Sequence, residues 1–421
     1  MHRFIGVLGL VVIVAISWTI SGRKQPFPWT LLCWGLGGQF VLAVLVLGIP
    51  FLGISGPLQF IFTAMNEFVN DVIGFAEAGS QFVFGPMLNT EKMGGFIFAV
   101  KVLPSIIFFS SLVAVLYHIG FLQIIVKGMA WVMFKTMKLS GAESLSTAAN
   151  IFLGQTEAPL FVKPFIAAMT RSELFCIMVG GMANTAGGVL IAYVGMLHDR
   201  MPNIAGHLIT SSVLSAPAAI LICKLMIPET STPATAGNLV MSEEKIDANT
   251  IEAATRGASE GLSLALNVAA MLIAFIALAA MANWMLAKIG SSLHLDLLIG
   301  APLSLEWVFG KLCAPLAWLI GIPWSEAQQI GGLLGQKVVF NEFVAYVKLS
   351  EIASQLSDRT VIIVSYALCG FANISSIGIQ VGGIGTMAPS RRGDLAALGI
   401  KAVIAGNLAS LSTAAIAGLL Y

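Results

Sequence analysis

Long apolar runs without charged residues alternate with shorter polar segments along this chain. Eight runs are about as long as a helix that crosses a bilayer, which needs roughly 20 apolar residues. They occupy residues 4–20, 28–54, 102–118, 174–197, 208–223, 261–287, 360–389 and 402–421. The pattern predicts an all-α polytopic membrane protein with eight transmembrane helices.

Two of these runs carry a glycine-rich polar segment in their middle. Residues 180–188 contain four glycines around Asn184 and Thr185, and residues 369–376 contain Gly370, Asn373 and two serines. Because glycine tolerates non-helical backbone, both helices are predicted to unwind there and expose backbone carbonyls.

Two further segments are predicted to be re-entrant helical hairpins. In the first, residues 142–153 and 159–168 form arms of about 15–18 Å at 1.5 Å per residue, roughly half of a hydrocarbon core of about 30 Å. The polar residues 154–157 are then the tip at the membrane midplane. The second hairpin is expected over residues 325–354, with its tip near 335–342. Non-helical backbone at this depth must be surrounded by protein or line a water-filled cavity.

The segments between the spans are more polar. Residues 55–95 intersperse phenylalanines with Asn, Asp and Glu, and residues 121–138 carry three lysines, so both are predicted to be helices at the membrane surface. Residues 228–257 form an extended polar loop and residues 290–324 a mixed connector.

Two basic pairs set the predicted orientation. Arg23 and Lys24 follow the first span, and Arg391 and Arg392 precede the last. The positive-inside rule places both pairs in the cytoplasm, and the span count puts them on the same side. Both chain ends are then outside, and the loop 228–257 is cytoplasmic.

The polar clusters form an internal repeat. The string LGQ at residues 153–155 recurs at 334–336, and GMAN at 181–184 recurs as GFAN at 370–373. The order hairpin, broken span, intact span occurs twice, with the odd span 261–287 between the copies, so the copies are predicted to be inverted. Inverted repeats with broken helices are typical of secondary transporters. The resulting regions are a scaffold at residues 1–138, a first transport repeat at 139–227, a loop, scaffold helix and connector at 228–324, and a second transport repeat at 325–421.

Composition agrees with this architecture. The 421 residues are 57% hydrophobic and 10% charged, far below the roughly 25% charged residues of soluble domains. The net charge of +1 gives no basic face for nucleic acid. The five cysteines show no spacing typical of a disulfide framework or metal site.

Two acids, Glu157 and Glu342, are predicted at membrane depth, where an unpaired charge is costly. Salt bridges of Glu157 with Lys163 and of Glu342 with Lys337 are the structural alternative. The functional hypothesis is that the acids hydrogen-bond a neutral solute rich in hydroxyl and amide groups. The side chains that would join them are Gln155, Thr156, Asn341, Asn373 and Ser376. Phe371 either packs there or closes a gate.

Oxygen atoms near the first tip and the first break are candidate ligands for a small cation. They are the side chains of Asn150 and Asn184 and the backbone carbonyls of Leu153 and Thr185. The C-terminal ends of helices favour cations. Helix capping is the alternative role for both asparagines.

Three strings resemble the signatures of the concentrative nucleoside transporters: NIFLGQTEAP at residues 150–159, NEFVAY at 341–346 and CGFANISSI at 369–377. The similarity extends from the first span to the C-terminus. It implies a homotrimer in which a scaffold holds a mobile transport domain, and nucleoside uptake driven by a cation gradient.

The resemblance also implies a role for each motif residue. Gln155, Thr156 and Glu157 would read the nucleobase, with Val189 packing on it. Glu342, Asn373 and Ser376 would hold the ribose hydroxyls, with Phe371 beside the site. Asn150, Leu153, Asn184 and Thr185 would form the sodium site.

Two features distinguish this chain among similar proteins. They usually have a serine or threonine where Asn184 stands, although an amide oxygen can also ligate sodium. The additional N-terminal spans of animal members are missing, which indicates a bacterial inner-membrane protein.

The sequence therefore predicts a sodium-coupled nucleoside importer that works by alternating access, with proton coupling as the alternative. An intramembrane enzyme using Glu157 and Glu342 as acid and base would need a nucleophile or metal motif, which the sequence lacks. A channel would favour a pore-lining ring over two half-length hairpins.

Overall fold

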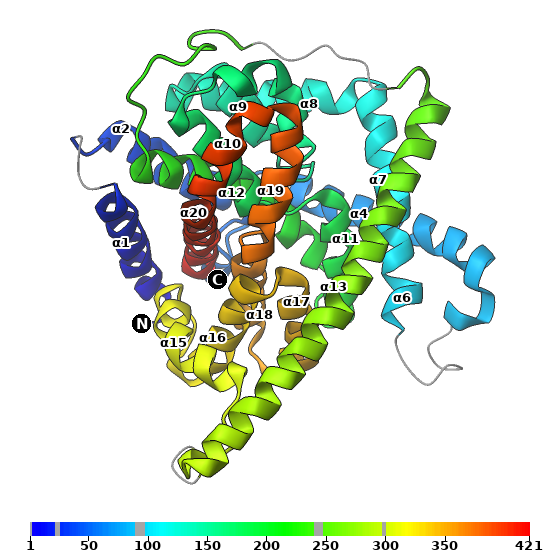
Figure 1. Cartoon of the computed structure of the whole chain (residues 1–421), viewed down its shortest axis with the longest axis vertical. Helices are drawn as coiled ribbons and strands as arrows, with labels where there is room; N and C mark the ends of the chain where they lie inside the picture. Colours follow the sequence, from blue (N-terminus) through cyan, green and yellow to red (C-terminus); the bar gives the residue numbers. More distant parts are fainter. Residues whose placement is uncertain (1, 22–25, 89–96, 240–246, 297–299) are drawn as a thin grey trace.

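The computed structural model describes residues 2–21, 26–88, 97–239, 247–296 and 300–421. In these residues the regular structure is helical, apart from one isolated bridge between Ile49 and Ile54. This confirms the predicted all-α membrane fold (Figure 1). Arg23 and Lys24, on which the orientation depends, lie outside the described residues.

The N-terminal region, up to residue 137, consists of helices that surround the later ones. In chain order they are α1 (His2–Ile20), α2 (Trp29–Leu32), the π-helical turn Cys33–Gly37, α3 (Gly38–Leu47), the 3-10 turn Pro50–Leu52, α4 (Gln59–Phe84), the 3-10 turn Gly85–Leu88, α6 (Phe98–Lys101), α7 (Leu103–His118) and α8 (Phe121–Met137).

The rest of the chain contains both hairpins and both broken helices. Its elements are α9 (Gly141–Ala149), the 3-10 segment η4 (Ala158–Ala168), α10 (Arg171–Ala183), α11 (Gly187–Leu197), α12 (Ile204–Met226), α13 (Thr250–Ser292), α15 (Leu305–Leu319), α16 (Trp324–Val339), α17 (Glu342–Ile352), the 3-10 turn Ala353–Gln355, α18 (Asp358–Leu368), α19 (Ile374–Met387), the 3-10 turn Pro389–Arg391 and α20 (Arg392–Leu420).

An inner group of helices packs around α20. Helices α10, α12, α18 and α19 all contact it, and 89% of the apolar stretch within Arg171–Leu197 is buried. In α13 the corresponding share is 17%, and α13 runs along the outside of the molecule beside α7 (Figure 1). The molecule therefore has a buried centre that includes α10, α12, α18 and α20, and an outer layer that includes α7 and α13.

Six helices of the described chain are long and apolar enough to span a bilayer, and they coincide with six of the eight predicted spans: Trp29–Leu47, Phe98–His118, Arg171–Leu197, Ile204–Met226, Thr250–Ser292 and Pro389–Leu420. The predicted first span is a shorter apolar helix, Phe4–Ile20. The predicted span 360–389 is divided by its break into α18 and α19.

Several predicted boundaries were wrong. The second span ends at Leu47, because the chain turns at Gly48 with a positive φ of 75°. Helix α13 begins at Thr250, inside the predicted polar loop, where the Asn249 side chain accepts hydrogen bonds from the first free N–H groups.

The first hairpin forms with its tip over residues 150–157, but its second arm is a 3-10 segment and not an α-helix. Pro159 and Pro164 explain this, because proline lacks the N–H group of a regular α-helical ladder. In the second hairpin the break is confined to Phe340 and Asn341.

Residues 335–337 were predicted at the second tip, but they belong to helix α16. A side chain at Gly335 would place its Cβ atom 2.4 Å from Cβ of Phe309. This glycine therefore permits close packing of α16 on α15 and does not break the helix.

Element order extends the repeat beyond the predicted copies. Helices α7 and α8 precede the first hairpin, and α13 and α15 precede the second. Helix α8 packs against α9 as α15 packs against α16. The predicted connector 290–324 thus contains a helix, α15, in the position that α8 occupies in the first copy.

The two surface segments are helical as predicted. Helix α4 buries Asn66, Val69, Val72, Ala76 and Ser80 at helical spacing. The opposite side exposes Phe60, Phe68, Phe75 and Phe82. Such two-sided helices suit the membrane surface. Residues 89–95 of the predicted segment lie outside the described part.

Candidate functional site

The breaks of the two interrupted helices meet at the centre of the molecule. The backbone N–H of Phe371 donates a hydrogen bond to the Asn184 carbonyl over 3.3 Å. Gly370 has φ 136°, and a Cβ atom there would lie 2.7 Å from the Ala183 carbonyl oxygen. Glycine is therefore required both for the backbone angle and for the close approach of the two chains.

Helix α20 satisfies carbonyl groups that the second break frees. The Ser410 hydroxyl donates to the Cys369 carbonyl over 3.2 Å, and the Asn407 amide donates to the Ala372 carbonyl over 2.8 Å. The Thr185 hydroxyl and the Cys369 thiol lie 3.4 Å apart, which adds a side-chain contact between the breaks. Hydrogen bonds from α20 therefore stabilise the non-helical backbone where the two breaks cross.

Beside this crossing, the second tip presents a buried carboxylate. Glu342 is the first residue of α17 and is 4% exposed. One carboxylate oxygen accepts a hydrogen bond from the Asn373 amide over 2.8 Å, and the other accepts one from the Tyr193 hydroxyl over 3.2 Å. Both donors are uncharged side chains.

Two asparagines fix the helix starts at this site. The Asn341 side chain accepts from the Val344 N–H over 2.9 Å and caps α17. The Asn373 side-chain oxygen accepts from the Ser376 N–H over 2.9 Å and caps α19, while its amide group holds Glu342. The break in the second span therefore positions Asn373 and Ser376 together.

The alternative pairing of Glu342 with Lys337 does not form, as no ion pair joins these two described side chains. Lys337 is 1% exposed, and its ammonium group donates to the Ala367 carbonyl in the last turn of α18 over 2.9 Å. A cation is favourable at this end of a helix. Glu342 is consequently held by hydrogen bonds from uncharged partners.

The first tip reaches this cluster through Gln155. Its amide group donates to the Ser376 hydroxyl over 3.3 Å, while its side-chain oxygen is buried and has no protein partner in the described chain. A Cβ atom at Gly181 would lie 2.8 Å from Cβ of Gln155, so the tip rests directly on α10. A chain of hydrogen bonds, which we call the polar line, therefore runs from Gln155 through Ser376 and Asn373 to Glu342.

Thr156 and Glu157 make no hydrogen bond to that line among the described residues. The Thr156 hydroxyl donates to the Glu157 carboxylate over 2.9 Å, and Glu157 is exposed. Glu157 lines a cavity of about 180 Å³ between the first tip and helices α7 and α13. That cavity also contains Phe109, Tyr117, Gly154, Arg256 and Glu260. Glu342 does not line this cavity, so the two predicted acids do not share it in this conformation.

The predicted cation ligands lie where α9 and α10 end. The Asn150 amide donates to the Ser146 carbonyl over 3.0 Å, and its buried side-chain oxygen has no protein partner in the described residues. The Asn184 amide donates to the Gly180 carbonyl over 3.4 Å, and its side-chain oxygen contacts the Ser215 hydroxyl. Both asparagines thus also act as caps, the alternative role.

The tip and the break are tied together at this point. The Gly187 N–H donates to the Phe152 carbonyl over 3.2 Å, which holds the turn that contains Leu153 against the start of α11. Leu153 and Thr185 are both buried. A neutral oxygen set with one orphaned buried oxygen fits a hard monovalent cation, and no group of three His, Cys, Asp or Glu suited to a metal occurs in the described residues.

Val189 and Phe371 contribute apolar surface. Val189 lies in the first turn of α11 and is 1% exposed, and Phe371 is half-buried at the crossing of the breaks.

No motif in the sequence marks Tyr193, whose hydroxyl binds Glu342, or Gln380. The Gln380 amide donates to the Met178 carbonyl over 3.0 Å, and its oxygen is another buried acceptor without a protein partner among the described residues. Both side chains stand singly in apolar helices, so only their neighbours in space identify them.

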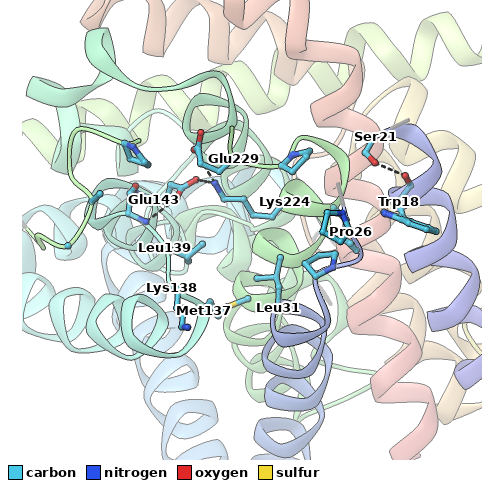
Figure 2. A pocket seen from close by; sticks show the side chains of 17 residues that line it. Trp18, Ser21, Pro26, Leu31, Met137, Lys138, Leu139, Glu143, Lys224 and Glu229 are labelled. Carbon is cyan, nitrogen blue, oxygen red and sulfur yellow. Dashed lines mark hydrogen bonds and ion pairs between the residues drawn. The ribbon is translucent and has the colours of Figure 1, made fainter. Parts of the chain in front are cut away.

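A separate charged network anchors the first arm of the first hairpin. Figure 2 shows Lys224 of α12 between Glu143 of α9 and Glu229. These residues line a cavity of about 390 Å³ that also includes Trp18 and Lys138. The Thr235 hydroxyl accepts a hydrogen bond from the Ala142 N–H over 3.1 Å, so the polar loop caps this arm as well.

Three family models match successive parts of the chain. They are "Na+ dependent nucleoside transporter N-terminus" at residues 8–87, "Nucleoside recognition" at residues 99–200 and "Na+ dependent nucleoside transporter C-terminus" at residues 207–418. Together they include both hairpins and both breaks.

Similar proteins match over nearly the whole chain. An uncharacterized transporter of Haemophilus influenzae is 44% identical over 98% of this chain and 96% of that protein. Solute carrier family 28 member 3 of Rattus norvegicus is 39% identical over 98% of this chain and 58% of that protein. A structure of CNTnw in an inward-facing substrate-bound state has a TM-score of 0.89 and 42% identity, covering 100% of this chain and 98% of that one. CNTnw also has a structure in an outward-facing state, with a TM-score of 0.89 and 41% identity.

Proposed function

This chain belongs to the concentrative nucleoside transporter family, and from that premise we propose that it is a sodium-coupled nucleoside importer that works by alternating access. The family transports nucleosides and is not a family of enzymes. The names of its models, which specify Na+ dependence, support Na+ as the coupling ion.

The polar line across the two tips carries the proposal for the substrate site. Glu342, Asn373 and Ser376 would hold the ribose hydroxyls, because a carboxylate with neutral neighbours accepts hydrogen bonds from hydroxyl groups. Gln155 is the bridge from this cluster to the first tip. A neutral polyol suits this set, whereas an anion would meet the Glu342 charge without an arginine.

The nucleobase would lie on the side of the first tip. Gln155, Thr156 and Glu157 offer an amide, a hydroxyl and a carboxylate to the edge of a base, and Val189 and Phe371 offer apolar contact beside it. In this conformation Glu157 faces the cavity next to α7 and α13, while Thr156 lies against Gly383 of α19. Closing the tip over a bound base would turn them toward it.

The orphaned side-chain oxygen of Asn150 supports the proposed sodium site. Asn150 and Asn184 would hold the ion with their side-chain oxygens, and Leu153 and Thr185 with their carbonyls. Bound Na+ supplies positive charge at the ends of α9 and α10, which the helix dipoles favour. These four residues belong to the first tip and the first break, so holding the ion would order the nucleobase side.

We further propose that the two repeats, residues 139–227 and 325–421, move as a transport unit against the scaffold. The inward-facing and outward-facing structures of CNTnw support an alternating-access mechanism. The exposed apolar residues of α13, such as Leu266 and Ile273, suit a scaffold that contacts lipid or other subunits. A homotrimer in a bacterial inner membrane is the proposed assembly and location.

Uptake of labelled uridine into proteoliposomes tests the proposal. An inward sodium gradient at equal pH should drive accumulation, whereas a proton gradient without sodium should not. Accumulation driven only by protons would establish the alternative coupling, and uptake that ignores both gradients would contradict symport. Chromatography of the vesicle contents should recover intact uridine, and cleaved product would contradict a transport function.

A further inference from the structure

Among the described residues, the buried Tyr193 hydroxyl is the one hydrogen-bond partner of the Glu342 carboxylate that comes from the other repeat. Tyr193 lies on α11 of the first copy and Glu342 begins α17 of the second. Both residues are almost completely buried, and their hydrogen bond measures 3.2 Å. The phenol must be the donor, because an ionised carboxylate has only acceptor sites.

Aromatic packing holds the Tyr193 ring in one orientation. It stacks flat on Tyr346, with ring centroids 4.0 Å apart and planes at 14°, and it contacts the edge of Phe343 at 5.0 Å. The Tyr346 hydroxyl is already committed to the Ser365 carbonyl over 2.7 Å. Because neither ring is free to turn, the Tyr193 hydroxyl is aimed at Glu342 before any substrate arrives.

The two protein donors divide the acceptor sites of Glu342. A carboxylate has about four lone-pair sites, two on each oxygen. Asn373 takes one on the first oxygen and Tyr193 takes one on the second. The side-chain hydrogen bonds of the described residues therefore leave one acceptor site on each oxygen, and this pair of sites suits two hydroxyl groups on adjacent carbon atoms.

We propose that Tyr193 is a positioning residue that sets Glu342 to recognise a vicinal diol, so that both ribose hydroxyls of the nucleoside are read. The proposal rests on the proposed role of Glu342 in substrate binding. Without the phenol, one carboxylate oxygen has two unused acceptor sites and the carboxylate can rotate. Discrimination between a sugar with two hydroxyls and one with a single hydroxyl should then fall.

The test compares uridine with 2′-deoxyuridine and 3′-deoxyuridine in proteoliposome uptake and in binding to the detergent-solubilised protein. In the unaltered chain, removal of either hydroxyl should weaken binding about tenfold, the order expected for a hydrogen bond to a charged group. If one of the two hydroxyls can be removed without effect, the two-hydroxyl assignment is overturned, and this arm needs no variant.

Tyr193→Phe keeps the stacked ring and removes only the hydroxyl. We expect its preference for uridine over at least one deoxynucleoside to fall about fivefold, while the preference between uridine and cytidine stays the same. Tyr346→Phe is the matched control, since it removes a hydroxyl of the same stack that binds Ser365 and not Glu342. Unchanged sugar preference in Tyr193→Phe, or an equal loss in Tyr346→Phe, overturns the inference.

Glu342→Gln separates this inference from the proposed function. If Glu342→Gln binds and transports uridine normally, the proposed substrate site is wrong and the role of Tyr193 falls with it. If Glu342→Gln loses uridine binding while Tyr193→Phe keeps full sugar discrimination, the substrate site stands and only the positioning role is wrong.

Discussion

The two hairpin tips occupy equivalent places in the repeat, yet they differ in how completely their side-chain oxygens are paired. At the second tip, Glu342 is buried and each of its oxygens accepts a hydrogen bond. At the first tip, Glu157 is exposed and bonded to its neighbour Thr156, and the buried oxygens of Asn150 and Gln155 have no protein partner in the described chain. At the second tip it is instead the Asn341 amide nitrogen that is buried without a protein partner in the described chain.

This difference indicates a division of labour between the copies. Buried polar groups without partners cost free energy, so they are expected where a ligand completes them. The second tip is preorganised, with its carboxylate already aimed. At the first tip, two buried side-chain oxygens lack protein partners in the described chain, and the proposed cation and nucleobase would supply them. Its proline-containing 3-10 arm also departs from the regular α17 of the second hairpin.

The largest expected effect comes from changing the two acids separately. Glu342→Gln should lower uridine uptake at least about a hundredfold, because its amide would place a donor against Asn373 or Tyr193 in a buried site. Glu157→Gln should lower it about tenfold, since Glu157 is exposed. Initial rates in proteoliposomes measure both, with unchanged gel-filtration profiles as the control. Equal losses of uptake in the two variants would contradict the proposed difference between the tips.

A second pair of changes concerns sodium. Asn150→Ala removes the orphaned oxygen and should raise the Na+ concentration for half-maximal uptake about tenfold. It should also reduce the Na+-dependent rise in the thermal unfolding midpoint, because a weaker ion stabilises the fold less. Asn341→Ala, at the second tip, is the control and should keep the Na+ dependence. A Na+ response that changes only in Asn341→Ala would place the ion at the other tip.

A change at the first tip should alter the preference between nucleobases without altering the preference between sugars. Gln155→Ala removes the side chain that bridges to Ser376 and should raise the uridine KM about fivefold, with a changed preference between uridine and adenosine. The ratio between uridine and its deoxy forms should stay constant. Gln329→Ala, an exposed position on α16, is the control. A loss of sugar discrimination in Gln155→Ala would contradict the assignment of base and sugar to different tips.

The smallest effect concerns the support of the first hairpin. Thr235→Ala removes the hydroxyl that accepts from the Ala142 N–H and should destabilise the protein by about 1 kcal/mol, as loss of a helix cap does. Thermal unfolding in detergent measures the change, with the exposed Thr230→Ala as control. An unaltered midpoint in Thr235→Ala would show that the loop does not stabilise this arm.

Much of the fold could be predicted because its causes are local. Apolar runs indicated the spans, and glycine with asparagine indicated both breaks, now seen at residues 184–186 and 369–373. The second tip was predicted too early, because Gly335 looks like a helix breaker in sequence. In the structure its missing side chain makes room for Phe309, a reason that only the neighbouring helix reveals.

The candidate site, like the fold, could be predicted only in part from the sequence. The motif residues were identified from sequence, but their partners were not. Lys337, four places from an Asn–Glu pair, suggested an ion pair, yet it reaches the end of α18. Tyr193 had no motif to mark it. The roles of the motif residues themselves remain predictions that the variants above test.

The amino-acid sequence alone is enough to specify a membrane-embedded helical repeat with polar breaks, because apolar length and backbone-breaking residues act within a few positions of the chain. Which oxygens are paired and which lack a partner depends instead on how the helices pack in three dimensions. The bond from Tyr193 to Glu342 joins residues 149 positions apart, and that from Gln155 to Ser376 joins residues 221 apart. Such contacts depend on how the two repeats pack across their breaks, and no local pattern encodes that packing.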